Sequence, residues 1–403
     1  MLHLRKVFLG VMLLALLAPV PASAQGGPDT TGHLLPMLAF VPDTPDNRQW
    51  VAYGDIATWY TAWDVPRVDS LDAVDALDAQ DRAAWLYTLS EQTTPPQALG
   101  LQFLMREADA QREALGFNFF DVERGLEAGQ PPDMVTALAL DVDPAQIDRA
   151  LTASGYTAGT LGTAGTLYRI RDDYEIDISA SLRAAQLGHL NRIGLVDGVT
   201  LVGSATAIIE SAFQAAAGDI PSLADDPAYR AAAGVVESDP ALDETGPLVG
   251  VILLPPDVLL VGSGRTTGEN PPSDQPGMLP PFTLAAFATR HTLPGEDPLP
   301  NGHGATSLVL ALVLAPGADA DAAAQTLAGR LDGYVSLVTG APLSDRWILA
   351  QSFGTEAEGL PVAVAVMRVD DPLPDESGAP GNPGVLSWVE LIFSRDVLFL
   401  AAE

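Results

Sequence analysis

The stretch VTALALDVDPAQIDRALTASG, residues 135–155, holds the clearest local signals for the fold. Val135–Val142 is a mostly apolar run of strand length that ends just before Asp143-Pro144. Asp followed by Pro favours a helix start, because the carboxylate accepts bonds from free N–H groups and Pro suits the first helical position. We therefore predict a strand over 135–142 and a helix over 145–154 that ends at Gly155.

A related order of strands and helices is expected twice along the chain. After this helix we expect a strand at 166–171, a hairpin of strands 191–195 and 199–203 around Asp197-Gly198, and a helix at 205–217. Near the C-terminus we expect a strand at 307–314, a helix at 319–334, a strand at 362–369 and a hairpin of strands 387–393 and 397–401. The pattern predicts two related strand–helix–strand–hairpin units, residues 131–240 and 241–403, the second without its last helix.

The remaining segments complete the predicted fold class. Residues 49–130 form a mostly helical region, with helices expected at 50–63, 69–89, 101–115 and 119–128. The second unit gains strands at 247–254 and 282–292 and two Gly/Pro-rich loops, 262–281 and 370–384. Together these elements predict an α+β protein whose antiparallel or mixed sheets are each covered by helices on one face.

The N-terminus has the features of a secretory signal peptide, residues 1–24. Arg5 and Lys6 precede an apolar stretch, and Ala22 and Ala24 form the small-residue cleavage pattern. We expect cleavage before Gln25 and a lead over residues 25–48. An uncleaved anchor is the alternative, which is disfavoured because the apolar stretch falls short of the roughly 20 residues that span a bilayer. With no later membrane segment expected, the mature protein should be secreted or extracytoplasmic and soluble.

Composition excludes several classes of function. The chain has 20 basic and 52 acidic residues and a formal charge of −32. This charge repels phosphate backbones, so we expect no nucleic-acid partner. Lys6 is the single lysine and leaves with the signal peptide, which excludes a Schiff base or a P-loop lysine in the mature protein. Because there is no cysteine, thiol nucleophiles, disulfides and thiolate metal sites are excluded as well, and no cofactor is expected.

Two groups of residues have the chemistry of metal ligands. His291, Glu296 and His303 could bind zinc, but their spacing matches no zinc motif and they flank a Gly/Pro-rich turn. We therefore interpret them as exposed loop residues. The second group repeats every third position, which spreads carboxylates around a helix instead of converging them on calcium, and predicts a solvated acidic helix. Its members are Asp69, Asp72, Asp75, Asp78 and Asp81.

Other patterns also have a structural interpretation. Charged residues alternate with Ile170, Tyr174, Ile176 and Ile178, which predicts a strand edge with one polar face. An aromatic group could stack on sugars but is more typical of a core: Trp50, Tyr53, Trp59, Tyr60 and Trp63. The segment 262–265 lacks a phosphate-loop pattern, and Ser, His and Asp residues are too scattered for a triad. We assign no catalytic, cofactor-binding or metal-binding residue.

Several short motifs give a resemblance over residues 116–236. They are Gly116-Phe117, Pro131-Pro132, Asp143-Pro144, Gly155-Tyr156 and Ser222-Leu223-Ala224-Asp225. This region resembles exported bacterial envelope proteins of unknown function that are built from repeated α+β units. The resemblance implies an α+β fold and an envelope location, and it supplies no functional residues.

Three hypotheses of function follow. The leading one is a non-enzymatic exported protein, either structural or binding a partner in the envelope or outside the cell. The second is a module that binds a small molecule, a glycan or a cation in a cleft between the two units. The third is a hydrolase that uses carboxylates or a His/Glu-bound metal.

Overall fold

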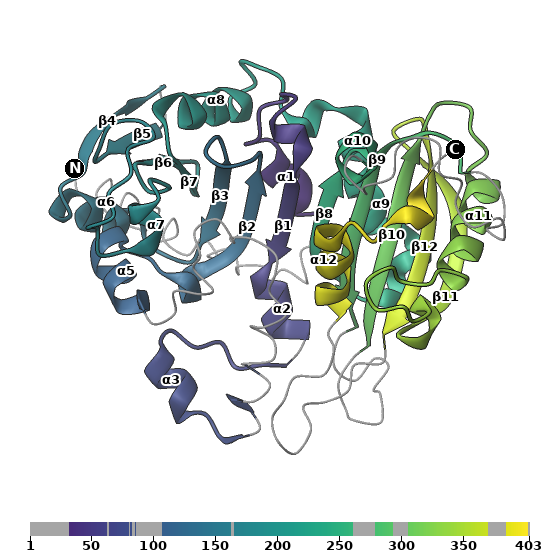
Figure 1. Cartoon of the computed structure of the whole chain (residues 1–403). Helices are drawn as coiled ribbons and strands as arrows, with labels where there is room; N and C mark the ends of the chain where they lie inside the picture. Colours follow the sequence, from purple (N-terminus) through teal and green to yellow (C-terminus); the bar gives the residue numbers. More distant parts are fainter. Residues whose placement is uncertain are drawn as a thin grey trace, which may run out of the picture. The chain divides into compact units, whose positions relative to one another are not determined.

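The computed structural model describes residues 32–62, 64–79, 81–82, 85, 107–162, 165–260, 279–292, 305–369 and 384–401. The chain divides into a short unit, residues 1–32, and a large unit, residues 33–403. All helices and strands named below belong to the large unit (Figure 1). The predicted signal peptide lies outside the described residues. Within the described ranges, no helix combines the length and the apolar character needed to cross a membrane.

The centre of the large unit is one sheet of twelve strands (Figure 1). Their order is β11-β12-β10-β9-β8-β1-β2-β3-β7-β6-β5-β4, and every neighbouring pair is antiparallel. The strands are β1 (Val51–Asp55), β2 (Val122–Ala128), β3 (Val135–Leu140), β4 (Thr157–Leu161), β5 (Gly165–Arg169), β6 (Arg192–Val196), β7 (Val199–Gly203), β8 (Leu248–Leu254), β9 (Phe282–His291), β10 (Thr306–Leu314), β11 (Trp347–Ala357) and β12 (Leu360–Val369). The described residues are therefore mixed α+β, with one antiparallel sheet.

Helices occur on both sides of this sheet. The α-helices are α1 (Leu34–Leu38), α2 (Ile56–Ala62), α3 (Leu71–Ala76), α5 (Ala108–Leu115), α6 (Pro144–Ala153), α7 (Arg183–Gln186), α8 (Thr206–Ala216), α9 (Pro227–Ser238), α10 (Pro256–Leu260), α11 (Ala320–Asp332) and α12 (Gly384–Ser394). Short 3-10 helices are η1 (Asn47–Gln49), η3 (Phe119–Asp121), η4 (Leu223–Asp225), η5 (Pro240–Thr245), η6 (Leu343–Asp345) and η7 (Leu398–Leu400).

Strand β10 shows how the two faces are used. Val309, Ala311 and Val313 belong to an apolar cluster with α1, α8 and α9. The alternate residues, among them Leu310, belong to a cluster on the opposite face with α11 and α12. A third cluster, on that same opposite face, joins β3 and β5–β7 to α2, α5 and α6. Because all nine residues of β10 are buried, the expectation of helices on only one face is wrong for this part of the sheet.

The region expected to be mostly helical contributes two central strands. The segment expected to be a helix at 50–63 is instead β1 followed by α2, and the helix expected at 119–128 is η3 followed by β2. The local sequence pattern favours a helix here, but tertiary contacts override it. Strand β1 pairs with β2 on one side and with β8 on the other, and this pairing connects residues far apart in sequence. In the range expected to be a helix at 69–89, the described residues contain α3 and further helical residues at 79, 81, 82 and 85. In the range expected to be a helix at 101–115, they contain α5, and residues 86–106 lie outside the described residues.

The C-terminal hairpin expected at 387–401 is also wrong. Residues 384–394 form α12, and 398–400 form η7. Trp388 is buried against Phe287 of β9, with ring centroids 5.0 Å apart, so the apolar run fills the core as a helix. Strands β4 and β11 were not predicted. The loops expected at 262–281 and 370–384 fall almost entirely outside the described residues.

Elements with local signals agree with the structure. Asp143 accepts a bond from Ala145 N at 2.9 Å and begins α6 after β3. Asp197 and Gly198, with φ of +46° and +80°, form the turn between β6 and β7. The predicted strands at 247–254, 282–292, 307–314 and 362–369 and the helices at 205–217 and 319–334 are confirmed within a few residues of each end.

The sheet ends in two edge strands, β4 and β11. Strand β11 has a register shift between Leu349 and Gln351. Further along it, Gly354 N donates to Asp321 Oδ1 of α11 at 2.9 Å. A Cβ on Gly354 would lie 2.4 Å from Asp321 N, so glycine is what allows this close approach. Helix α11 therefore lies against the outermost strand.

Candidate functional site

The most exposed apolar side chains of the described residues include four in one segment, residues 170–187, which we call the isoleucine loop. Ile176 and Ile178 are 64% and 86% exposed, Tyr174 is 46% exposed and Leu187 is 55% exposed. Single exposed apolar residues are normal on a protein surface, whereas a group in one segment indicates a contact site. The loop follows β5 and includes α7.

Arg192 connects the isoleucine loop to the sheet, and Arg171 forms an ion pair within the loop. Arg192 on β6 is buried, forms an ion pair with Asp173 at 2.5 Å and donates to the Arg171 carbonyl at 2.6 Å. Arg171 in turn pairs with Asp177 at 2.6 Å. Hydrogen bonds from Ser179 and the pairing with Arg171 hold the pKa of Asp177 below its usual range, so this carboxylate is charged at neutral pH.

The side chain of Asn191 binds backbone carbonyl groups of the loop. Asn191 is buried, and its side-chain amide donates to the carbonyls of Asp172 at 3.1 Å and Glu175 at 2.8 Å. The two ends of the loop are also joined by a backbone hydrogen bond, in which Asp177 N donates to the Gln186 carbonyl at 3.2 Å. Gly188 has φ of +77°, and a Cβ there would lie 2.7 Å from the Glu175 carbonyl oxygen. The loop thus depends on a glycine at this point.

Tyr174 fixes the turn that precedes the isoleucines. Its φ is +61°, which is uncommon for a bulky residue, and its N–H donates to the Ser204 carbonyl at 2.9 Å. Its hydroxyl donates to Asp133 Oδ1 at 2.6 Å. This bond and partial desolvation raise the pKa of Tyr174 to about 12, so the hydroxyl remains a donor at neutral pH. Ile176 and Ile178 are therefore presented on an ordered backbone.

The structure corrects the predicted strand edge in this segment. Strand β5 ends at Arg169, and Ile170 packs against the core, while Ile176 and Ile178 face solvent. The alternation of charged and apolar residues predicted an extended strand edge with one polar face. The positive φ of Tyr174 interrupts the extended backbone, so the residues after β5 do not continue the strand.

The predicted metal candidates do not form a described site. His291 is buried at the end of β9, with Nδ1 2.9 Å from Thr306 Oγ1, so its interpretation as an exposed loop residue is wrong. Strand β9 continues through it and pairs it with Thr306. Glu296 and His303 lie outside the described residues. In the part of the chain that the structure describes, no group of three or more His, Cys, Asp or Glu could hold a metal ion.

The aromatic and acidic groups have structural positions. Tyr53, Trp59 and Tyr60 are buried in two different apolar clusters, which confirms the core interpretation for these three residues. Trp50 packs on Phe393 with ring centroids 5.6 Å apart, and Trp63 lies outside the described residues. Among the acidic repeat, Asp69, Asp72, Asp75 and Asp78 are exposed, while Asp81 is half-buried. The segment 262–265 lies outside the described residues.

A buried carboxylate that sequence reasoning missed is Asp396. Its oxygens accept from the hydroxyls of Tyr334 and Ser336, each at 2.5 Å, and from Leu337 N at 3.0 Å. Burial opposes ionisation, but these hydrogen bonds hold the pKa of Asp396 below its usual range. The group connects the segment after α12 to the loop after α11, so it supports the fold.

Comparison with known proteins adds no family to these observations. No protein-family model, no curated protein and no solved structure matches this chain.

Proposed function

We propose that this chain is an exported, non-enzymatic protein that works outside the cytoplasmic membrane by binding a partner protein through the isoleucine loop. The proposal of export rests on the leader: two basic residues, an apolar stretch and the pattern Ala22-Ser23-Ala24. The proposal of partner binding rests on one observation, the outward placement of Ile176 and Ile178 on a backbone held by buried Arg192 and Asn191.

An ordered loop is suited to binding because little conformational entropy is lost when the partner docks. The side chain of Ile178 is 86% exposed, so most of its apolar area is available for burial. Burying an isoleucine completely contributes about 1.5–3 kcal/mol. Two such side chains, with the aromatic ring of Tyr174 beside them in sequence, can supply the apolar centre that most interfaces have.

The charges around the loop favour a partner with a basic rim. Asp172, Asp173 and Glu175 are exposed on the same segment. The whole chain carries a formal charge of −32, which adds a long-range attraction for basic proteins and repels acidic ones. The occupant we propose is therefore an envelope or extracellular protein with an apolar cleft bordered by Lys or Arg.

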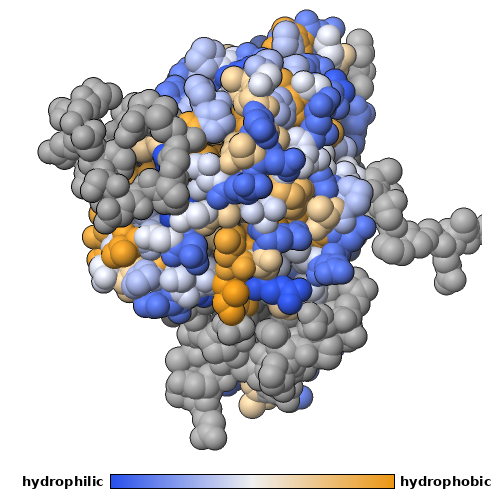
Figure 2. Space-filling view, turned by 90° about the vertical axis from the view of Figure 1, so that its right-hand side faces the viewer, coloured by the Kyte–Doolittle hydropathy of each residue, from blue (hydrophilic) through white to orange (hydrophobic). Residues whose placement is uncertain are grey.

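A competing exposed apolar surface lies at the other end of the sheet. Ile348 on β11 is 59% exposed, close to the 64% of Ile176. It is one of four exposed apolar residues in the connection after α11 and on β11: Val335, Leu337, Val338 and Ile348. Figure 2 shows the side of the molecule that carries β11, where hydrophobic and hydrophilic residues are mixed. Strand β11 and the strand β5 that leads into the isoleucine loop lie near opposite ends of the sheet. A partner can therefore be assigned to one end or the other.

The test begins with a photoreactive residue placed at Ile178 or at Ile348, with crosslinking in intact cells of the source organism. The protein captured at Ile178 is identified and purified, and its affinity is measured for the wild type, Ile178→Asp and Ile348→Asp. We expect Ile178→Asp to weaken binding by at least about tenfold, because one buried isoleucine is lost, and Ile348→Asp to have no effect. Affinity should also fall as salt is added.

Two results would remove the proposal. One is a partner whose affinity falls with Ile348→Asp and not with Ile178→Asp. The other is a chain that turns over a substrate and loses that activity when one side chain is changed. Export is tested separately by N-terminal sequencing of the protein recovered from outside the cytoplasmic membrane, where we expect Gln25 as the first residue; an intact Met1 in the cytosol would contradict it.

We also propose that the two halves of the large unit share one ancestral plan; the support is the order of strands and helices, in which α12 replaces the hairpin expected at 387–401. In the first half, β3 is followed by α6 and then by strands that lead back to β7, the neighbour of β3. In the second half, β10 is followed by α11 and then by β11 and β12, the neighbour of β10. Each series is followed by a helix, α8 or α12, which supports a common origin.

A further inference from the structure

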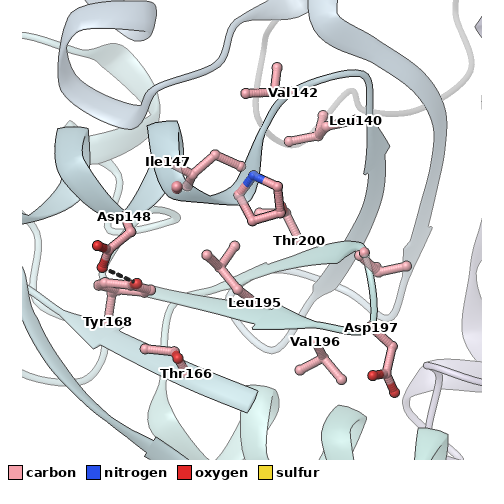
Figure 3. A pocket seen from close by; sticks show the side chains of 14 residues that line it. Leu140, Val142, Ile147, Asp148, Thr166, Tyr168, Leu195, Val196, Asp197 and Thr200 are labelled. Atoms are coloured by element: carbon pink, nitrogen blue, oxygen red, sulfur yellow. Dashed lines mark hydrogen bonds between the residues drawn. The ribbon is translucent and has the colours of Figure 1, made fainter. Parts of the chain in front are cut away.

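A cavity of about 430 Å³ lies between α6 and the ends of strands β3, β5, β6 and β7. This volume falls within the range of roughly 300–1,000 Å³ that is usual for small-molecule sites. Figure 3 shows apolar side chains around it, among them Leu140, Val142 and Leu195. Asp148 and Tyr168 lie together on one side, and Asp197 lies at the far side, in the turn between β6 and β7.

The floor of the cavity is a row of side chains across the sheet. Thr166 on β5 is paired with Leu195 on β6, and Leu195 is paired with Thr200 on β7. The next row, which includes Tyr168 and Ile193, is buried with the apolar residues of α6. The cavity lies beside the first row, in which Thr166 and Leu195 are partly exposed and Thr200 is buried. Its floor therefore alternates hydroxyl and apolar groups.

The polar end of the cavity is set by one hydrogen bond. Tyr168 OH donates to Asp148 Oδ1 at 2.6 Å, as Figure 3 shows. Burial and this bond raise the pKa of Tyr168 above its usual value, so the phenol stays protonated and continues to donate. A carboxylate has two oxygens and accepts several bonds, so Asp148 can accept from a ligand while it holds Tyr168. The ring of Tyr168 is buried and fixes the position of the pair.

The charge of the lining selects the kind of ligand. Among the described residues that line the cavity, two are Asp and none is Lys, Arg or His. An anion would enter against two carboxylates and the formal charge of −32 of the whole chain, whereas a cation is favoured. An ammonium group also has the donors that Asp148 can accept.

We propose that this cavity binds a small organic ammonium ion with an apolar body. The ammonium group donates to Asp148 beside the Tyr168 hydroxyl, and the apolar body lies on Leu195 and against Leu140 and Val142. The site lies between α6 and the β6–β7 hairpin and is independent of the isoleucine loop, so either proposal can fail without the other.

The experiment compares three probes with the same phenylethyl body and head groups of different charge: 2-phenylethylammonium, 2-phenylethanol and 3-phenylpropanoate. Each is titrated into the full mature chain, and binding is followed by calorimetry and by NMR shifts of residues 140–148 and 195–200. We expect the ammonium probe to bind with a Kd of about 1 mM, as is ordinary for a fragment of this size, and the alcohol to bind about tenfold more weakly. The carboxylate should not bind.

Variants then locate the ammonium group. Asp148→Asn keeps the shape of the side chain and removes its charge. Because Asp148 is exposed and solvent screens its charge, the variant should weaken binding of the ammonium probe by about two- to fivefold, with little effect on the alcohol. Asp332→Asn on α11 makes the same change of charge on an exposed residue outside the cavity and should leave binding unchanged. Leu195→Trp should reduce binding of both probes by filling the space, and circular dichroism should show that each variant is folded.

Each remaining outcome overturns the proposal. Equal affinity for the ammonium and the alcohol, or an Asp148→Asn variant that binds as the wild type does, removes the ammonium assignment. Binding that shifts resonances outside the residues lining the cavity, or no binding of any probe, removes the site. Preference for the carboxylate would reverse the electrostatic argument.

Discussion

Replacing Asp396 with alanine should destabilise the large unit by about 4 kcal/mol. Asp396 is buried and accepts from Tyr334 and Ser336 at 2.5 Å and from Leu337 N at 3.0 Å. A hydrogen bond to a charged group contributes roughly 1.5–3 kcal/mol, and alanine leaves three donors without their acceptor. The contributions of neighbouring hydrogen bonds are not additive, so we use a destabilisation near the lower end of the summed contributions of the three bonds.

The loss can be measured as a thermal midpoint. The large unit spans residues 33–403, and an unfolding entropy of about 2.1 cal/mol/K per residue converts a loss of about 4 kcal/mol into a fall in Tm of roughly 5 °C. Hydrogen exchange supplies a local reading, since Leu337 N should lose protection first. Asp345→Ala is the control: Asp345 is exposed in the same connection, and its loss should cost less than about 0.5 kcal/mol.

The same carboxylate should make stability depend on pH. Its pKa in the folded protein is lowered, while in the unfolded chain it is about 3.9. The folded state therefore binds protons less readily than the unfolded state, and the stabilisation is fully present above the unfolded pKa. It is lost as pH falls through the folded pKa. The difference in stability between the wild type and Asp396→Ala should shrink below about pH 4. A loss of less than about 1 kcal/mol at neutral pH, or an equal loss in Asp345→Ala, would refute this reasoning.

Three further predictions concern other positions. Gly188→Ala should cost about 1–2 kcal/mol because its φ is +77°, and exchange at residues 174–178 should accelerate; unchanged exchange would mean that Gly188 does not order the loop. Glu237 is half-buried, and burial raises its pKa, so the folded state holds the proton of this carboxyl more tightly than the unfolded state does. The free energy of unfolding should therefore fall as pH rises from the unfolded pKa of about 4.3 through the folded pKa. Urea unfolding of Glu237→Gln should lack this decline, and parallel pH curves for the two proteins would contradict it. Trp388→Ala should cost about 3–5 kcal/mol, since Trp388 is buried against Phe287; a small loss in urea unfolding would argue against the packing of α12.

The part of the fold that sequence predicts best is the part with local chemical signals. Asp143-Pro144 begins α6 because the carboxylate and the fixed φ of proline act within a few residues. Asp197-Gly198 forms a hairpin turn because both residues adopt positive φ. In these places the chain needs no distant partner to choose its conformation.

The elements that sequence misses are chosen by distant contacts. Strand β1 lies between β2 and β8, whose residues are far away in the chain, and its flanking aromatics fit a helix equally well. The run that becomes α12 is mostly apolar, so its periodicity does not separate a helix from a strand; burial of Trp388 against β9 decides. The candidate site shows the same limit, because Ile176 and Ile178 alternate with charges as strand residues do. Their exposure follows from Tyr174 and Asn191, which act through residues elsewhere.

The contact between α11 and β11 has a consequence for assembly. A bare outer strand offers its N–H and C=O groups to any extended chain and invites open-ended stacking of sheets. To pair with β11 at this point, another strand would have to break the hydrogen bond from Gly354 N to the Asp321 carboxylate and displace α11, which carries Asp321. At that end, fibril-like growth therefore starts with the loss of a native contact, which raises the barrier to it.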